Sequence, residues 1–462
     1  MFYFKSSKGI ILFDILLAFS LSFLFIAIIS EASINSRQIF ERAKARAELL
    51  DVYEETNMNS PSKLYGNNQS EMDFSLSSST GNLSFVKIAM NENAGLNEAV
   101  GTPYCSVDYF NSEAAGSYQY FQSLNDSGQP NFKTAAITPI TLPIDPLLPL
   151  TDLEVRNGIA YISTDSSIAS DPDLIIVDIS DPNAPRIIST INTGPGLSSI
   201  ALAGKRIFAA ATSAAAQLHI IRMDGLSNPF LEKKFKLSLP YATATPPLAS
   251  AIFFNNNKVY LGTEKWDGDE FSIIDVSNPL APITIGGFET NSKINDIYVK
   301  NGIAYAAASD QNQLRVLDVG DPANPILVNS FGPSGWQRQE GKAISFFEDG
   351  LNLGRTSGGF NFTTDHEAFA WASTSSTTLI NPKSVDIPGG VYGIIKDRFR
   401  IYLATRQINR EFQVLDSQFT TSTTVSYSLP IQPQAMACDR DNIYILAHSA
   451  PVIYEINFMS HD

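Results

Sequence analysis

The chain of 462 residues carries a formal net charge of −15, which disfavours a nucleic-acid partner because such partners need a clustered basic face. Its length exceeds what one ordinary core serves, so we expect several domains or one repetitive architecture. Only Cys105 and Cys438 are present, which excludes a disulfide framework and a cysteine-based zinc site.

The N-terminus is predicted to be a membrane anchor. Residues 1–9 contain Lys5 and Lys8 and no acid, and the apolar stretch Ile10–Ile29 contains Asp14 as its only charge. About 20 apolar residues are enough to cross a bilayer. The positive-inside rule places the rest of the chain outside the cell.

The run Lys8-Gly9-Ile10-Ile11-Leu12-Phe13-Asp14 resembles the class III leader of type IV prepilins and pseudopilins. The resemblance implies that a prepilin peptidase cuts after Gly9 and that the new N-terminus at Ile10 is methylated. It also implies that Asp14 pairs with the N-terminus of a neighbouring pilin subunit during assembly. The family usually has Phe where this chain has Ile10 and Glu where it has Asp14.

Asp14 has a physical argument of its own, because an ionisable group inside an apolar span is retained mostly where it finds a partner. The alternative is an aspartate near the interface that reaches the lipid headgroups. The helical pattern continues without Gly or Pro, so residues 10–56 are predicted to form one long helix, first hydrophobic and then amphipathic. Its outer half mixes charges of both signs, which suits a solvated face or packing against other pilin helices.

Residues 57–136 are rich in Asn, Ser and Gly and predict a small β-rich or irregular segment of the pilin type. Beyond them, prolines recur between Ile137 and Leu150 and indicate an extended connector that opens the last domain, residues 137–462.

The last domain contains a repeat. An apolar strand followed by an acid and a turn recurs at Leu174–Pro182, Leu218–Gly225, Phe271–Pro279, Leu314–Pro322 and Phe412–Asp416. The acids of the first four copies lie 46, 51 and 43 residues apart, a spacing typical of propeller blades, and Asp416 follows 98 residues later, about two more periods. Each copy is preceded by further short strands, and residues 342–390 have the length of one degenerate blade. These patterns predict a mainly β fold, a β-propeller of about seven four-stranded blades.

The motif in Leu174–Pro182 and its copies resembles the LVIVD repeat of bacterial and archaeal surface proteins, over roughly Thr151 to Phe458. The resemblance implies a propeller and a cell-surface context, not a reaction. The last copy leaves no room for an outer strand, so Ile140–Leu148 is expected to supply it and to close the ring.

Candidate sites are few. The repeated Asp178, Asp275 and Asp318 precede turns, where aspartate caps backbone N–H groups, so we interpret them as structural rather than catalytic. Acidic turns at residues 171–173, 267–270 and 439–442 match no complete calcium loop, and solvated turns are the favoured interpretation. Trp266, Trp336 and Trp371 fall in the longer loops of the third to fifth blades, where they would bind a ligand or pack in the core.

The four histidines are scattered, so we expect no catalytic residue, no metal and no cofactor. Cys105 and Cys438 form a disulfide outside the cell or stay as two buried thiols. We therefore expect a minor or tip pilin, in the cell envelope or in a pilus, whose propeller binds an extracellular protein or glycan. The alternatives are a membrane-anchored propeller enzyme that acts on surface carbohydrate and a pseudopilin of a secretion system.

Overall fold

The computed structural model describes residues 135–457 with gaps at residues 167, 169, 242–243, 333–338, 348–349, 357–365, 372–378, 380–381, 397–399, 417–424 and 440–441. Of the first 134 residues it describes only four short strands. These are β1 (Glu71–Met72), β2 (Ser77–Ser78), β3 (Gly81–Asn82) and β4 (Ile88–Ala89), of which β1 pairs with β4 and β2 with β3. Gly9, Ile10, Asp14, Cys105 and the predicted long helix lie outside the described residues. Within the described part of the chain, no helix is long and apolar enough to cross a membrane.

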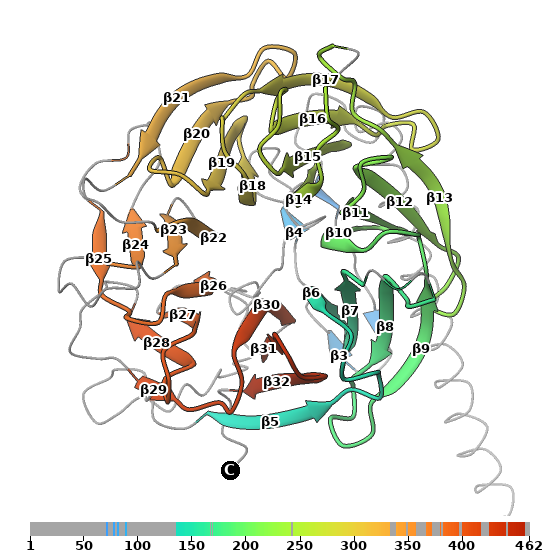
Figure 1. Ribbon diagram of the computed structural model, residues 1–462. Coiled ribbons are helices and arrows are strands. Elements are labelled where there is room, and N and C mark those ends of the chain that lie inside the picture. Colours follow the sequence, from blue (N-terminus) through green and yellow to red (C-terminus); the bar gives the residue numbers. More distant parts are fainter. Residues whose placement is uncertain are drawn as a thin grey trace, which may run out of the picture. The chain divides into compact units, whose positions relative to one another are not determined.

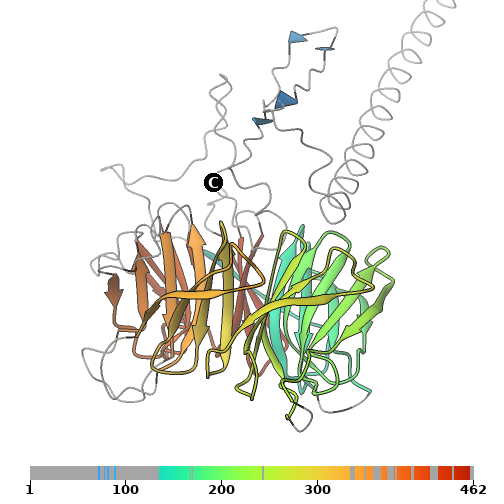
Figure 2. The ribbon, with the colours of Figure 1, turned by 90° about the horizontal axis from the view of Figure 1, so that it is seen from above.

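The described residues form seven four-stranded antiparallel sheets around one axis, which makes the domain a seven-bladed β-propeller (Figure 1). Blade 1 is β6 (Leu150–Arg156), β7 (Ile159–Thr164), β8 (Leu174–Asp178) and β9 (Arg186–Ile191); blade 2 is β10 (Leu197–Ala203), β11 (Arg206–Ala211), β12 (Leu218–Met223) and β13 (Pro229–Phe235); blade 3 is β14 (Ala249–Asn255), β15 (Lys258–Thr263), β16 (Phe271–Asp275) and β17 (Ile283–Phe288); blade 4 is β18 (Ile294–Lys300), β19 (Ile303–Ala308), β20 (Leu314–Asp318) and β21 (Ile326–Phe331). Seen edge-on, the strands of the blades run between the two faces of the propeller (Figure 2).

The remaining blades include the degenerate one. Blade 5 is β22 (Gly341–Phe347), β23 (Gly350–Arg355), β24 (Ala368–Trp371) and β25 (Lys383–Val385); blade 6 is β26 (Val391–Lys396), β27 (Arg400–Thr405), β28 (Phe412–Asp416) and β29 (Val425–Tyr427); blade 7 is β30 (Pro433–Asp439), β31 (Asn442–Ala447), β32 (Val452–Asn457) and β5 (Ala136–Thr141). Blade 5 lacks the repeat motif yet has all four strands, so the expectation of a degenerate blade at residues 342–390 is confirmed.

The repeat strands are apolar because neighbouring blades cover both of their faces. In β8, β16 and β20 the first four residues are all buried, and the acid that ends each strand is not. Strands covered on both sides favour continuous apolar runs over alternation. Seven clusters of buried side chains follow from this in the described residues, one at each junction between two blades.

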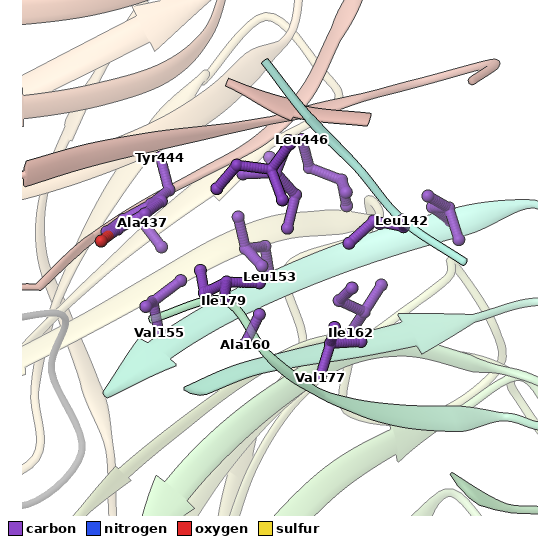
Figure 3. Packing of buried hydrophobic residues seen from close by; sticks show 14 of the residues in the cluster. Leu142, Leu153, Val155, Ala160, Ile162, Val177, Ile179, Ala437, Tyr444 and Leu446 are labelled. Carbon is purple, nitrogen blue, oxygen red and sulfur yellow. The ribbon is translucent and has the colours of Figure 1, made fainter. Parts of the chain in front are cut away.

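The ring closes between blade 7 and blade 1. Strand β5 pairs with β32 over its whole length, from Ala136 opposite Asn457 to Thr141 opposite Val452. The predicted closure by the segment before blade 1 is confirmed, but the closing strand is Ala136–Thr141 and not Ile140–Leu148, so only Ile140 and Thr141 of the expected segment belong to it. Prolines 143, 146 and 149 lack the N–H that a strand needs, and a turn forms at Asp145, whose carbonyl accepts from Leu148 N at 3.2 Å. Leu142, Leu153 and Leu446 then pack at this junction (Figure 3).

Candidate functional site in the propeller channel

The inner strands β6, β10, β14, β18, β22, β26 and β30 surround the propeller axis (Figure 1). Each has a β-bulge at its second residue, where the register with the next strand skips one position. A bulge re-aims the side chain of the extra residue. The seven bulge residues are Thr151, Ser198, Ser250, Asn295, Lys342, Tyr392 and Gln434. Every one of them carries a polar group.

In blades 1 to 4 the bulge side chain has a structural role. It donates a hydrogen bond to the carbonyl of the first residue in the next inner strand. The four bonds are Thr151 Oγ1 to Leu197 O at 2.6 Å, Ser198 Oγ to Ala249 O at 2.9 Å, Ser250 Oγ to Ile294 O at 2.6 Å and Asn295 Nδ2 to Gly341 O at 2.8 Å. Blades 5 and 6 depart from this rule, because neither Lys342 nor Tyr392 hydrogen-bonds through its side chain to any described residue.

A second ring of side chains, the channel mouth, consists of the residue that follows the second strand of each blade. The backbone N–H of this residue donates to the carbonyl directly before the inner strand, as from Asp165 to Pro149 at 3.0 Å and from Ser309 to Lys293 at 2.9 Å. The mouth residues are Asp165, Thr212, Glu264, Ser309, Thr356, Arg406 and His448. Blades 1 to 5 thus contribute acids and hydroxyls, and blades 6 and 7 contribute the two basic residues.

The acids and hydroxyls of the mouth are already bound to neighbours. Glu264 Oε1 forms an ion pair with Lys293 Nζ at 2.5 Å, and Ser309 Oγ donates to Glu340 Oε2 at 3.0 Å. Through these contacts Glu264 and Ser309 link adjacent blades, which gives both residues a structural role. The basic residues of blades 6 and 7 are held differently.

Arg406 and His448 converge on one amide. The Arg406 Cζ atom lies 3.8 Å from the centre of the Tyr392 ring, and its Nη2 donates to Gln434 Oε1 at 3.4 Å. His448 Nδ1 lies 2.8 Å from the same oxygen. Because Gln434 Nε2 donates to Thr151 O at 3.3 Å, its Oε1 is the acceptor in both contacts. His448 therefore donates from Nδ1 and keeps Nε2 for another partner.

Three carboxyl groups line the channel beside this ring: Asp152 and Glu154 on β6 and Asp296 on β18. Asp152 Oδ2 accepts from Ile200 N at 2.9 Å, and Asp296 Oδ2 accepts from Ile344 N at 2.7 Å. Both aspartates thereby link their inner strand to the next blade. The carboxyl of Glu154 makes no hydrogen bond to a described residue, so it is open to a ligand.

Burial raises the pKa of all three carboxyl groups. It raises the pKa of Glu154 to about 8, with a contribution from the charge of Asp152, and the pKa of Asp296 to about 7. It also raises the pKa of Asp152. At neutral pH Glu154 is therefore mostly protonated, and Asp296 carries only part of a charge.

Lys342 on β22 shares this space. Its positive charge lowers the pKa of both Asp152 and Asp296, which come from other blades, so the three side chains influence one another across the channel. Burial lowers the pKa of Lys342, the charges of Lys293 and Arg406 lower it further, and the charges of Asp296 and Glu340 oppose the shift. Burial likewise lowers the pKa of His448, with contributions from Arg406 and Lys342. The three basic residues therefore lie close enough together to repel one another.

Neither cation at this position has an acid to itself. Among the described residues, no carboxylate lies within ion-pair distance of Lys342 or Arg406. Elsewhere in the propeller, Arg206 pairs with Glu232 at 2.7 Å and Arg315 with Asp310 at 2.6 Å. The channel mouth at blades 5 to 7 thus gathers positive charge that forms no direct ion pair with a described carboxylate, although Asp296 and Glu340 lie near enough to raise the pKa of Lys342.

The turn acids named from the sequence have the structural role expected of them. Asp178 Oδ1 accepts from Ser180 N at 3.1 Å, and Asp275 Oδ1 accepts from Ser277 N at 2.8 Å. In Asp318 the same oxygen accepts from the backbone N–H two residues on, at 2.9 Å. The interpretation of these acids as turn caps is confirmed.

The acidic turns at 171–173 and 267–270 contain buried caps that the sequence interpretation missed. Asp173 Oδ2 accepts from Gly194 N at 2.8 Å, and Glu270 Oε2 accepts from Thr290 N at 2.7 Å. They belong to a repeated position directly before the third strand, held by Asp173, Gln217, Glu270, Gln313, Glu367 and Glu411. In the described residues, no group of three or more His, Cys, Asp or Glu side chains is placed to hold a metal ion.

The tryptophans and cysteines singled out from the sequence lie in different surroundings, and some of them lie outside the described residues. Trp371 ends β24 and is 1 % exposed, so it belongs to the core and not to a binding loop. Trp266 is half-buried in the β15–β16 loop, where its Nε1 donates to Asp269 O at 3.1 Å, and Trp336 lies outside the described residues. Cys438 is buried in β30, and its pairing with Cys105 stays a prediction because Cys105 is not among the described residues.

The comparison with known proteins agrees with this fold. Residues 152–193, 266–290 and 293–332 match the family described as the LVIVD repeat, and no curated protein matches the chain. A catalytically inactive virginiamycin B lyase from Staphylococcus aureus with quinupristin is similar in structure, at 12% identity and a TM-score of 0.51 over 71% of this chain and 100% of that one.

Two further solved structures share the architecture. A streptogramin B lyase has 12% identity and a TM-score of 0.51 over 70% of this chain and 97% of its own. Raptor from Chaetomium thermophilum has 11% identity and a TM-score of 0.51 over 70% of this chain and 28% of its own. At these identities the likeness concerns the fold alone. The chain therefore contains LVIVD repeats and folds, over its described residues, as a seven-bladed β-propeller.

Proposed function

We propose that this chain is a surface-displayed binding protein, whose propeller takes up a ligand at the channel mouth and whose N-terminal segment is a pilin-like anchor. The observation that carries the binding role is the pair of Lys342 and Arg406, which have no carboxylate partner among the described residues although the chain has a net charge of −15. An enclosed charge without a partner costs free energy. A ligand that completes the site accounts for keeping both.

The anchoring role rests on the sequence from Lys8 to Asp14. Prepilin peptidase would cut after Gly9, and the helix from Ile10 would hold the protein in the membrane or pack against other pilin subunits. A propeller on every subunit would crowd a helically packed fibre. The favoured role is therefore that of a minor or tip subunit that adheres to an extracellular ligand.

Mass spectrometry of the protein from sheared surface filaments and from membranes of the same cells tests this role. We expect a mature chain that begins at methylated Ile10 and is recovered in the filaments. In the Gly9→Leu variant we expect the full-length precursor and no surface display. A wild-type chain that begins at Met1 and stays in the membrane fraction would reduce the N-terminus to a simple anchor.

A second function, an enzyme acting on surface carbohydrate, is favoured by one observation. The channel combines carboxyl groups of raised pKa, Glu154 and Asp296, with Lys342, whose pKa is lowered. Groups with pKa values displaced toward neutrality are suited to general acid–base catalysis.

The two functions differ in what happens to the ligand. Incubation of the full-length protein with surface glycans, followed by mass spectrometry of the glycans, is expected to recover them unchanged. Cleaved glycans in the wild type, together with intact glycans in Glu154→Gln, would establish the enzyme instead. The Glu154→Gln variant keeps the size of the side chain and removes only its acid chemistry.

A further inference from the structure

The polar groups of the channel mouth also indicate which ligand it takes, an inference that rests on the proposed binding function. Three basic residues come from three successive blades: Lys342 at the bulge of blade 5, Arg406 at the mouth of blade 6 and His448 at the mouth of blade 7. Because Gln434 Oε1 accepts from both Arg406 and His448, two of the three are held in place before a ligand arrives. Preorganised donors lose less entropy on binding.

The N–H donors of Lys342 and Arg406 that bind no described residue are suited to an anionic ligand. Besides its contact with the Tyr392 ring, the Arg406 side chain makes only two hydrogen bonds to described residues, both at 3.4 Å and both to neutral oxygens, Pro433 O and Gln434 Oε1. A guanidinium has five N–H donors, and an ammonium has three. Lys342 uses none of its donors on a described residue. Charge-assisted hydrogen bonds to a carboxylate would satisfy both groups.

The carboxyl groups beside Lys342 and Arg406 further limit the class of ligand that fits the channel mouth. Glu154 is mostly protonated at neutral pH, so it offers one O–H donor and free lone pairs. Asp152 and Asp296 each keep lone pairs beyond their backbone bonds. Such groups suit the hydroxyls of a sugar ring.

We propose that the channel mouth binds a carboxylate-bearing saccharide, with its carboxylate on Lys342 and Arg406 and its hydroxyls on the channel carboxyl groups. The bulge rule supports the assignment of Lys342. At this position blades 1 to 4 use a short side chain to bind the next blade, and blade 5 replaces it with a long cation that makes no such bond.

The test is calorimetric titration of the detergent-solubilised full-length protein with trigalacturonate, with neutral galactotriose and with a tripeptide that has a free C-terminal carboxylate. We expect binding of trigalacturonate that weakens with added salt, and binding of the neutral sugar at least tenfold weaker. Lys342→Met and Arg406→Gln should each weaken trigalacturonate binding about tenfold or more, the effect of one lost charge-assisted contact.

Two controls keep the test decisive. Lys236→Met removes the same charge from an exposed position beyond β13 and should leave binding unchanged. Lys342→Arg keeps the charge and should restore most of the affinity lost in Lys342→Met, which separates loss of the contact from misfolding.

The outcomes against the proposal are equally specific. Equal binding of galactotriose, tripeptide binding without uronate binding, or a Lys342→Met variant that binds like the wild type would overturn it. The result is also independent of processing at Gly9. Surface display without uronate binding would refute the proposed ligand and support the pilin-like anchor. Uronate binding by an unprocessed protein would support the proposed ligand and refute the pilin-like anchor.

Discussion

Asp178 and Asp152 belong to the same blade, yet their surroundings set their acidities in opposite directions. Asp178 ends β8 at the surface, where Ser180 Oγ donates to it at 2.6 Å and Arg186 Nη2 at 2.8 Å. These bonds lower the pKa of Asp178 to about 2. Asp152 also accepts several hydrogen bonds, but its enclosure in the channel outweighs them and raises its pKa.

This difference shows which carboxyl groups could bind a ligand or transfer a proton. Turn acids such as Asp178 recur from blade to blade because each caps its own turn. Among the described residues, the three channel acids Asp152, Glu154 and Asp296 belong to blades 1 and 4; burial raises the pKa of each, and Glu154 and Asp296 hold protons near neutral pH. Acids that repeat from blade to blade therefore stabilise the propeller fold, whereas acids that occur in only some blades belong to the candidate site.

The largest expected effect contrasts Asp296 with Asp178 through the pH dependence of stability. A raised pKa means that the folded state binds the proton more tightly, so the stability from Asp296 is present below pH 3.8 and is lost as the pH rises through about 7. The change amounts to roughly 4 kcal/mol, at about 1.36 kcal/mol for each pH unit. Urea unfolding between pH 4 and 8 should show this loss in the wild type and a flatter profile in Asp296→Asn.

Asp178 should behave in the opposite sense. Its lowered pKa adds stability above pH 3.8 that is lost as the pH falls toward 2. Asp178→Asn should therefore change the profile only in the acid range. If both variants altered the same pH range, the contrast between channel and turn acids would fail.

The next largest effect applies the same contrast to two histidines. His219 on β12 is 0 % exposed, neither ring nitrogen has a hydrogen-bond partner, and its cross-strand neighbour is Lys234. Burial, aided by Lys234, lowers the pKa of His219 to about 4. Stability from keeping this ring neutral is complete above pH 6.5 and falls by about 3 kcal/mol as the pH drops to 4.

His219→Leu should remove that acid-range loss and leave stability at pH 7 equal or higher, because it replaces a buried polar ring by an apolar side chain of similar size. Unfolding by urea at pH 4.5 and pH 7 measures both points. The matched variant His448→Leu changes an exposed histidine at the mouth, whose pKa is lowered by partial burial and by Arg406 and Lys342, so we expect the same sign of change at pH 4.5 but a smaller one than in His219→Leu. A wild-type-like profile in His219→Leu would show that the ring is hydrated in the folded state.

The scaffold could be predicted from the sequence because its signals are local and repeat. The run from Leu174 to Pro182 shows a strand, its acid and its turn within nine consecutive positions, and its copies give the blade count. The caps at Asp173 and Glu270 were also visible, because an acid or amide stands before most repeat strands. They were missed because their partners, Thr193 and Thr290, lie far along the chain.

The channel site could not be predicted in this way. Lys342, Arg406 and His448 stand in different blades, and only the closed ring brings them together. A signal does exist at Lys342, which appears when the seven inner strands are aligned by their bulges and four of the seven positions hold a short hydroxyl or amide donor with the same partner. Bulges interrupt the strand register, however, so the alignment follows from the structure and not from periodicity.

The smallest expected effect tests whether the turn acids are only structural. Asp275 Oδ1 accepts one hydrogen bond, from Ser277 N at 2.8 Å. Asp275→Ala should lower the free energy of unfolding by about 1 kcal/mol, the usual value of one such bond, and Asp275→Asn should lower it less because it keeps an acceptor. Urea unfolding at pH 7 resolves the two. Neither variant should change ligand affinity at the channel mouth, and a loss of affinity in both would mean that the turn acids act on the site as well as on the scaffold.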